Sequence, residues 1–165
     1  MRSPAVTTRL ARPSDAATVA RTAHLGIETY RSFAPKGWEP HAPPLHVERL
    51  TDSLRDRRTW ALLADVAGEP AAHVAMFPDW QPGGAIYLWH LFVRPAWWGS
   101  GLASDLHDAF VAEATARDYR DARLHTAAGN ARARRFYERR GWRVSAPPET
   151  WIGLPVIEYR CRLQP

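Results

Sequence analysis

The sequence predicts a single α/β domain of the mixed α+β type, in which a central sheet of about seven strands carries helices on both faces. Three observations support this prediction. The chain has 165 residues, the usual size of one domain. Segments with helical apolar spacing alternate with short strand-like runs. No internal repeat or low-complexity tract interrupts their order. We therefore expect one domain over residues 7–163.

The first third of the chain predicts one strand and two helices. Residues 6–11 are typical of a short strand, and Ser14 is a good cap for the helix that apolar spacing predicts over about 15–30. Four prolines and a glycine in residues 34–44 predict an irregular loop. A charge-rich helix is expected after it, over 45–57.

The middle of the chain predicts an antiparallel hairpin and a buried strand. Residues 59–66 and 71–77 resemble strands joined by a short turn. Residues 85–93 are almost all apolar or aromatic, which is typical of a central strand covered on both faces.

Two further helices and three further strands complete the order. The helices are predicted over 101–117 and 131–140, with a strand at 122–127 between them. The last two strands are predicted near 142–145 and 156–163.

Composition limits the location and the chemistry. Cys161 is the single cysteine, so the chain can form neither an internal disulfide nor a cysteine-based zinc site, and we expect no metal. The longest uncharged stretch, residues 80–93, is shorter than the roughly 20 apolar residues that span a bilayer. No apolar core of signal-peptide type follows Met1, so a cytoplasmic protein without a membrane partner is expected.

The charge is unevenly distributed. The formal net charge is +5, and residues 117–143 carry nine basic and three acidic groups, against one and six in residues 59–116. This basic block predicts binding of an anion, with nucleic acid, a phosphorylated cofactor and a merely solvated helix face as the alternatives.

A glycine-containing junction links the buried strand to the next helix. Gly99 and Gly101 stand directly before that helix, whose first N–H groups have no partner within the helix. Glycine lets an anion approach those groups closely, so the junction predicts a pyrophosphate site, with a simple turn as the alternative. The third glycine of a dinucleotide fingerprint and the Gly-Lys-Ser/Thr of a P-loop are both missing.

A second motif, Asn130-Ala131-Arg132-Ala133-Arg134-Arg135-Phe136-Tyr137, opens the last helix. Asn130 is suited to cap it. Phe136 and Tyr137 are either core aromatics or functional groups. A phenol has an ordinary pKa near 10, so Tyr137 is suited to protonating a leaving thiolate.

Together the two motifs resemble those of the GCN5-related N-acetyltransferases (GNAT), whose pattern is V-x-P-x-x-x-G-x-G-L-A followed by N-x-x-A-x-x-F-Y-E-x-x-G-[FW]. The resemblance covers nearly the whole chain. It implies the GNAT fold, in which the fourth and fifth strands separate, and transfer of an acetyl group from acetyl-CoA to an amine.

The resemblance also implies roles for individual residues. Backbone groups of Leu91 and Val93 would pair with the pantetheine arm, Asn130 would contact the same arm, and Tyr137 would protonate the departing thiolate. Basic side chains around Arg134 would assist the 3′-phosphate. The other implied cofactor contacts are Trp98, Gly99, Ser100, Gly101, Leu102 and Ala103.

Two departures from the family pattern concern phosphate binding and the general base. Trp98 stands where relatives usually have Gln or Arg, so that one phosphate contact is lost or replaced by an indole. Tyr87 and Trp89 stand where relatives that use a general base often have Glu or His.

Strand alternation places Tyr87, Trp89, Leu91 and Val93 on one face and His90 on the other. His90 is therefore either a packed core residue or the base. Glu28 and His125 are further candidates for the base, and a reaction without a base is the remaining alternative.

The amine acceptor is expected between the loop after the first helix and the loop before the last strand. An acid beside an indole suits an ammonium group, although the indoles are equally suited to anchoring these loops. The expected acceptor contacts are Glu28, Trp38, Tyr87, Trp89 and Trp151.

We expect a small-molecule primary amine as the acceptor. The alternatives are acetylation of a protein N-terminus or lysine, and a non-catalytic CoA-binding module. Nucleic acid is not expected as a partner, because the arginines lie where the family binds CoA. An exposed edge strand makes a homodimer plausible.

Overall fold

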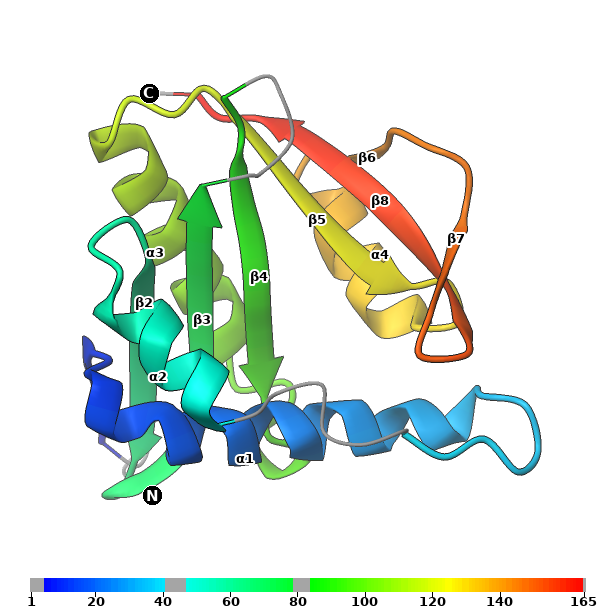
Figure 1. The fold of residues 1–165 in the computed structure, drawn as a ribbon, viewed down its shortest axis with the longest axis horizontal. Helices are drawn as coiled ribbons and strands as arrows, with labels where there is room; N and C mark the ends of the chain where they lie inside the picture. The colour runs from blue at the N-terminus through cyan, green and yellow to red at the C-terminus, as the bar shows by residue number, and fades with distance from the viewer. Residues whose placement is uncertain (1–4, 41–46, 79–83, 165) are drawn as a thin grey trace.

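The computed structural model describes residues 5–40, 47–78 and 84–164, which form an eight-stranded mixed sheet with helices on both faces (Figure 1). The strands are β1 (Val6–Leu10), β2 (Trp60–Val66), β3 (Glu69–Pro78), β4 (Ile86–Val93), β5 (Asp121–Ala127), β6 (Arg143–Val144), β7 (Glu149–Trp151) and β8 (Leu154–Arg162). The helices are α1 (Ala16–Glu28), α2 (Val47–Arg55), α3 (Leu102–Ala116) and α4 (Ala131–Arg139). Three short 3-10 turns accompany them, over Pro13–Asp15, Thr29–Ser32 and Pro95–Trp97.

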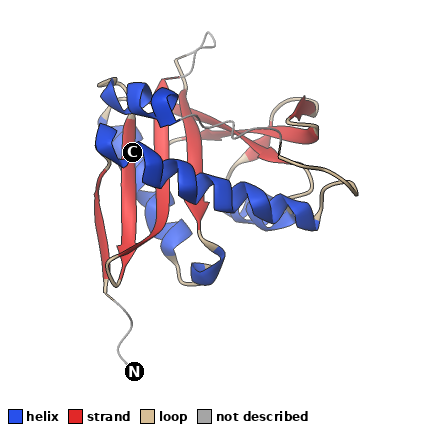
Figure 2. Cartoon of the chain, turned by 60° about the horizontal axis from the view of Figure 1, so that its bottom comes forward, coloured by secondary structure: helices blue, strands red, loops and turns tan. Residues whose placement is uncertain are grey.

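The sheet has the order β1-β2-β3-β4-β5-β8-β6, and β7 pairs separately with β8. Helices α1 and α2 cover one face, with α1 crossing the strands, while α3 and α4 lie behind the other face (Figures 1 and 2). The predicted fold class is therefore confirmed. No helix among the described residues is long and apolar enough to cross a bilayer.

Strands β4 and β5 separate almost as soon as they begin. They are parallel and pair only at Ile86 with Ala122 and at Tyr87 with Arg123. Beyond these two pairs β4 follows β3 and β5 follows β8, so that the two halves of the sheet form a V (Figure 1). The N-termini of α3 and α4 follow the carboxyl ends of these two strands, at the open end of the V.

Two elements differ from the sequence-based expectation. β7 was not predicted, so Glu149 and Trp151 belong to a short strand rather than to a loop, and a turn containing Gly153 at φ 74° joins this strand to β8. The first helix ends at Glu28 and continues as a 3-10 turn, where Thr29 donates both its backbone N–H and its hydroxyl to the Gly26 carbonyl, the hydroxyl at 2.6 Å.

A bulge in β4 reverses the side-chain alternation. The register shift between Ala75 and Met76 of β3 leaves Trp89 without a partner on that strand. One extra residue moves every later side chain to the other face. The residues that pack toward α3, on both sides of the bulge, are Ile86, Leu88, Leu91 and Val93. The predicted common face of Tyr87, Trp89, Leu91 and Val93 is therefore wrong, and His90 lies on the face of α1, in contact with Phe92.

Among the described residues, three histidines are buried and held neutral. Burial lowers the pKa of His73 to about 3, and burial and the neighbouring His73 lower the pKa of His90 well below its ordinary value. Burial, together with the nearby Arg140, lowers the pKa of His107 to about 4. Neutral His107 also accepts the indole N–H of the fully buried Trp142 at 2.9 Å.

A glycine in α1 lets this helix approach β4. A Cβ atom at Gly26 would overlap the ring of Phe92, which packs in the cluster under α1. The two residues also line the space between β4 and β5. The close contact of α1 with the sheet therefore depends on the absence of a side chain at this position.

We expect the free energy of unfolding to fall as the pH decreases from 7.5 to 5. The unfolded chain takes up protons below about pH 6.5, whereas the folded chain excludes them from these histidines, at a cost of about 2 kcal/mol for each at pH 5. The carboxyl groups titrate mainly below this range. Urea unfolding at pH 7.5 and at pH 5 measures the change in the free energy of unfolding. It should shrink by about 2 kcal/mol in His107→Gln, which removes one of these buried imidazoles. A pH-independent stability contradicts the assignment.

We expect Gly26→Ala to destabilise the protein by about 1–3 kcal/mol through overlap with Phe92. Helix propensity alone predicts the opposite sign, a gain of about 1 kcal/mol. Urea unfolding followed by tryptophan fluorescence distinguishes the two effects. In a Phe92→Leu background the overlap is relieved, so that the same glycine substitution should cost much less there.

Candidate functional site

A cavity of about 690 Å³ opens where β4 and β5 separate. Its walls come from both halves of the sheet, from the end of α1 with the turn that follows it, and from the N-terminal ends of α3 and α4. The residues from the predicted cofactor contacts that line it are Leu91, Val93, Trp98, Gly99, Gly101, Leu102, Ala103 and Asn130.

The glycine junction presents free amides to this cavity. Gly99 and Gly101 have φ values of 82° and 95°, and no atom lies within 4 Å of the place where a Cβ would stand at either. The N–H groups of Gly99, Gly101 and Ala103 donate to no other group in the described ranges. Ser100 is not part of the lining, and its hydroxyl donates to the Trp97 carbonyl at 2.7 Å. These free donors at a helix N-terminus suit a pyrophosphate.

Trp98 and Arg132 meet across the mouth of the cavity. The indole N–H of Trp98 donates to the Val93 carbonyl at 2.9 Å, and the Arg132 guanidinium lies 4.2 Å from the centre of the Trp98 rings. Since Trp98 follows β4 and Arg132 begins α4, this cation–π contact connects the two arms of the V. No carboxylate in the described part of the chain pairs with Arg132. A guanidinium thus lies beside the free amides.

Arg134 points elsewhere. Its guanidinium donates to the Tyr159 hydroxyl and to the Ala128 carbonyl, both at 3.2 Å, and it does not line the cavity. The sequence could not separate Arg132 from Arg134, because both belong to one arginine-rich helix.

Tyr137 places a neutral phenol in the cavity wall. Its side chain is buried, and burial, with smaller contributions from Tyr30 and Tyr87, raises its pKa well above the ordinary value. The phenol therefore holds its proton at neutral pH. Asn130 caps α4 as predicted, its side-chain oxygen accepting the Ala133 N–H at 3.1 Å.

Tyr30 is a cavity residue that the sequence did not reveal. It belongs to the 3-10 turn after α1, interacts with the side chain of Asn130, and has a pKa of about 12 because it is buried. Nothing in the local sequence shows that this turn bends toward α4. Phe33 lies nearby, packed against Gly129.

His90 lies outside the cavity lining. The ring is 5% exposed, its Nδ1 atom lies 3.1 Å from Nε2 of His73, and it stacks on Trp89 at 4.2 Å. Trp89 itself does line the cavity. Of the two interpretations of His90, as a packed core residue or as the base, this buried environment fits the packed core residue.

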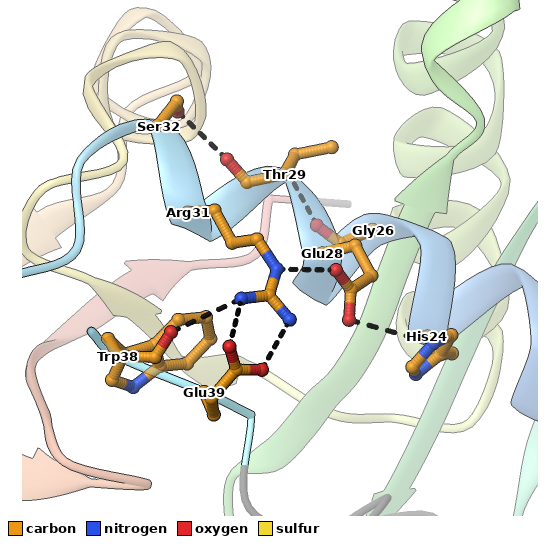
Figure 3. Close-up of polar contacts among 8 residues, drawn as sticks. All are labelled: His24, Gly26, Glu28, Thr29, Arg31, Ser32, Trp38 and Glu39. Atoms are coloured by element: carbon orange, nitrogen blue, oxygen red, sulfur yellow. Dashed lines mark hydrogen bonds and ion pairs between the residues drawn. The ribbon is translucent and has the colours of Figure 1, made fainter. Parts of the chain in front are cut away.

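Glu28 is held in an ion-pair network on the acceptor side. Figure 3 shows Arg31 between two carboxylates, with its Nε atom 2.7 Å from Glu28 and its two terminal nitrogens 2.9 and 2.7 Å from Glu39. The hydrogen bond from Arg31 lowers the pKa of Glu28, and His24 lies 3.7 Å from the same carboxylate. Arg31 also donates to the Trp38 carbonyl at 3.3 Å. Glu28 thus fixes the loop that follows α1.

The two expected acceptor loops are joined to each other. The indole N–H of Trp38 donates to the Ile152 carbonyl in the turn between β7 and β8, at 2.8 Å. Trp38 therefore anchors its loop, whereas the side chain of Trp151 on β7 is 42% exposed. Neither indole lines the cavity.

A polar cluster lies at the closed end of the V. The Tyr87 hydroxyl is 2.8 Å from Nδ1 of His125, and Nε2 of His125 is 3.7 Å from the Glu158 carboxylate. His125 lines the cavity, whereas Tyr87 and Glu158 are not part of its lining. In the described ranges no group of three or more His, Cys, Asp or Glu side chains is placed to hold a metal ion.

Comparison with solved structures finds proteins of similar architecture. It is similar to a GCN5-related N-acetyltransferase from Rhodopseudomonas palustris, with 21% identity, a TM-score of 0.75, and coverage of 99% of this chain and 98% of that one. It is similar to PaiA N-acetyltransferase from Thermoplasma acidophilum in complex with coenzyme A, with 14% identity, a TM-score of 0.71, and coverage of 93% of this chain and 98% of that one. It is also similar to yncA from Salmonella typhimurium with its cofactor acetyl-CoA, with 18% identity, a TM-score of 0.74, and coverage of 97% of this chain and 95% of that one.

At these identities the similarities concern the fold. A comparison with curated proteins finds no match. Residues 25–142, however, match the acetyltransferase (GNAT) family. The matched segment contains both motifs, the glycine junction and Tyr137, and covers most of the chain. This protein therefore belongs to the GNAT family of acetyltransferases.

Proposed function

We propose that this protein transfers the acetyl group of acetyl-CoA to the primary amine of a small molecule, by direct attack of the amine in a ternary complex. One observation carries the proposal. A single cavity combines free amides at the start of α3 with the buried, neutral phenol of Tyr137. The first feature suits a pyrophosphate, and the second suits a departing thiolate.

The shape and charge of the cavity fit coenzyme A. Two helix N-termini and Arg132 favour an anion at the open end. Beyond Tyr87, β4 has no partner on the β5 side, so backbone groups around Leu91 and Val93 can pair with the amides of the pantetheine arm. The similar structures of PaiA and yncA contain coenzyme A and acetyl-CoA. Acetyl-CoA would supply an activated acyl group and a good leaving thiolate.

The protein contributes position and proton transfer. The walls of the V hold the thioester near Tyr137, which donates its proton to the sulfur as the carbon–sulfur bond breaks. The phenol carries the proton for this step, and its place in the cavity wall brings that proton to the site where a thiolate would develop.

A small acceptor is favoured by the fixed loops. The Trp38 bond to Ile152 and the network of Glu28, Arg31 and Glu39 tie the loop after α1 to the β7–β8 turn. These contacts bound the acceptor side. A cytoplasmic location fits the single cysteine, and a homodimer fits the exposed β1 edge.

We expect wild-type protein to bind acetyl-CoA and Arg132→Gln to bind it about tenfold more weakly, because one charge-assisted phosphate contact is lost. Isothermal titration calorimetry measures both affinities. Arg135→Gln is the matched control, since Arg135 is exposed on the same helix but outside the cavity. Absence of binding to the wild type at millimolar acetyl-CoA would overturn the proposed function. Equal affinities of the two variants would remove Arg132 from the site.

We expect Tyr137→Phe to lower kcat about 100-fold while the acetyl-CoA affinity stays within about twofold, because the phenol donates its proton only as the thiolate leaves. Release of free CoA thiol in the presence of an amine panel measures kcat. Tyr119→Phe, which removes a phenol outside the cavity, is the control. An unchanged kcat in Tyr137→Phe contradicts the assignment.

A further inference from the structure

The cavity between β4 and β5 is bordered by elements from both faces of the sheet. The N-terminal ends of α3 and α4, with the free amides and Arg132, border it on one face, and α1 with the turn after it borders it on the other (Figures 1 and 2). Under the proposed function coenzyme A occupies the first side, so the acceptor amine enters from the side of α1. The side chains there therefore decide which amine can be bound.

The turn after α1 separates its charged side chains from its aromatic ones. In a 3-10 turn, residues three apart lie on the same side. Glu28 and Arg31 form one such pair and bind each other at 2.7 Å, and Glu39 also holds Arg31 (Figure 3). Tyr30 and Phe33 form another pair, with ring centres 5.2 Å apart. The two aromatic residues line the cavity, whereas the three charged ones do not.

Two further rings on this side come from the strands. Trp89 of β4 lines the cavity, packs against the cluster under α1 and stacks on His90, with ring centres 4.2 Å apart. His125 of β5 also lines the cavity, but its nitrogens are directed at residues outside the lining. Nδ1 lies 2.8 Å from the Tyr87 hydroxyl, and Nε2 lies 3.7 Å from the Glu158 carboxylate. His125 thus adds another ring to the wall.

The described residues on this side offer no charged partner to a second group of the acceptor. Apart from His125, the basic or acidic side chains among the described lining residues are Arg132 and Arg139, and both belong to α4 on the cofactor side. Hydrogen bonds from neighbouring side chains outweigh burial and lower the pKa of Glu158 to about 2, so the carboxylate beside His125 is charged. A carboxylate on the acceptor would lose water and face this negative charge. A second ammonium would lose water without reaching Glu158, which is outside the lining.

We infer that the acceptor is an aromatic primary amine, with a short chain between its nitrogen and its ring and with no second charged group. The inference rests on the proposed function and names its substrate class. The ring of the acceptor lies against Tyr30, Phe33 and Trp89, where offset and edge contacts between aromatic rings are favourable. The chain carries the nitrogen toward Tyr137, which belongs to α4 on the other face of the sheet.

The transfer balances for such an amine. The neutral nitrogen forms a bond to the acetyl carbon, the carbon–sulfur bond breaks, and the thiolate takes the proton of Tyr137. One N–H proton passes to solvent, and solvent returns a proton to the Tyr137 oxygen. The products are the amide and free CoA.

The first test uses wild-type protein, acetyl-CoA and four amines, with release of free CoA as the readout. Phenethylamine is the reference, L-phenylalanine adds a carboxylate to it, cyclohexylethylamine has an aliphatic ring instead, and putrescine has a second ammonium in place of the ring. We expect kcat/KM for phenethylamine to exceed that for L-phenylalanine and for putrescine about 100-fold, because their second charge is desolvated without a partner. It should exceed that for cyclohexylethylamine about fivefold, because only an aromatic ring makes the favourable ring contacts.

The second test compares Phe33→Leu and Trp89→Leu with the control Tyr119→Leu, whose ring is partly buried but outside the cavity. The measured quantity is the ratio of kcat/KM for phenethylamine to that for cyclohexylethylamine. This ratio should fall from about five to about two in each site variant, because one aromatic wall is lost, and should keep its wild-type value in the control. Because the ratio is taken within each variant, a partial loss of folded protein cancels. Calorimetry should find the acetyl-CoA affinity of all three variants within about twofold of the wild type.

The outcomes separate the acceptor class from the proposed function. Wild-type protein that binds no acetyl-CoA overturns both. If it binds acetyl-CoA but does not acetylate phenethylamine, or acetylates putrescine or L-phenylalanine equally well, only the acceptor class is overturned. A wild-type ratio near one, or a wild-type ratio in both Phe33→Leu and Trp89→Leu, overturns the role of the aromatic wall. If circular dichroism shows that the site variants do not fold, the wild-type panel decides.

Discussion

The separation of β4 from β5 after Tyr87 is the feature on which the rest of this structure depends. A paired strand satisfies its backbone groups within the sheet, whereas a strand that leaves its neighbour exposes one edge. In this protein the exposed edges line a cavity between the two arms of the V. The carboxyl ends of both strands point to the opening, so the helices that follow them place two N-termini there. One interruption in pairing therefore produces both the space and its preference for anions.

The titratable groups around this space differ in how deeply they are buried. His73 and His90 contact each other in the core and stay neutral, so they contribute packing rather than proton transfer. Tyr137 is buried as well, but its phenol lies in the cavity wall and carries its proton at neutral pH. His125 is partly exposed and faces a fixed carboxylate. Residues of one chemical type thus have different uses because their surroundings differ.

The departures from the family pattern have local explanations. Trp98 replaces the polar residue that relatives usually carry, yet its indole supports Arg132, so a cation still lies beside the glycine junction. The acceptor loops are similarly supported. Trp38 and the arginine between Glu28 and Glu39 hold the loop after α1 against the β7–β8 turn. Both devices connect segments that are far apart in the sequence.

The sequence by itself determined the family, the element order and the glycine junction, because hydrophobic periodicity and short motifs are local properties of the chain. The sequence did not predict β7, because its three residues are exposed and show no apolar pattern. The faces of β4 were predicted wrongly because a bulge at Trp89 arises from pairing with β3, and one extra residue reverses the alternation. Only the tertiary structure decided that Arg132 and Arg139 of α4 reach the cavity while Arg134 and Arg135 do not, that His125 lines it, and that Tyr30 joins it. These outcomes depend on packing between β4, β5, β8 and α1, and such contacts are not encoded by spacing along any one of them.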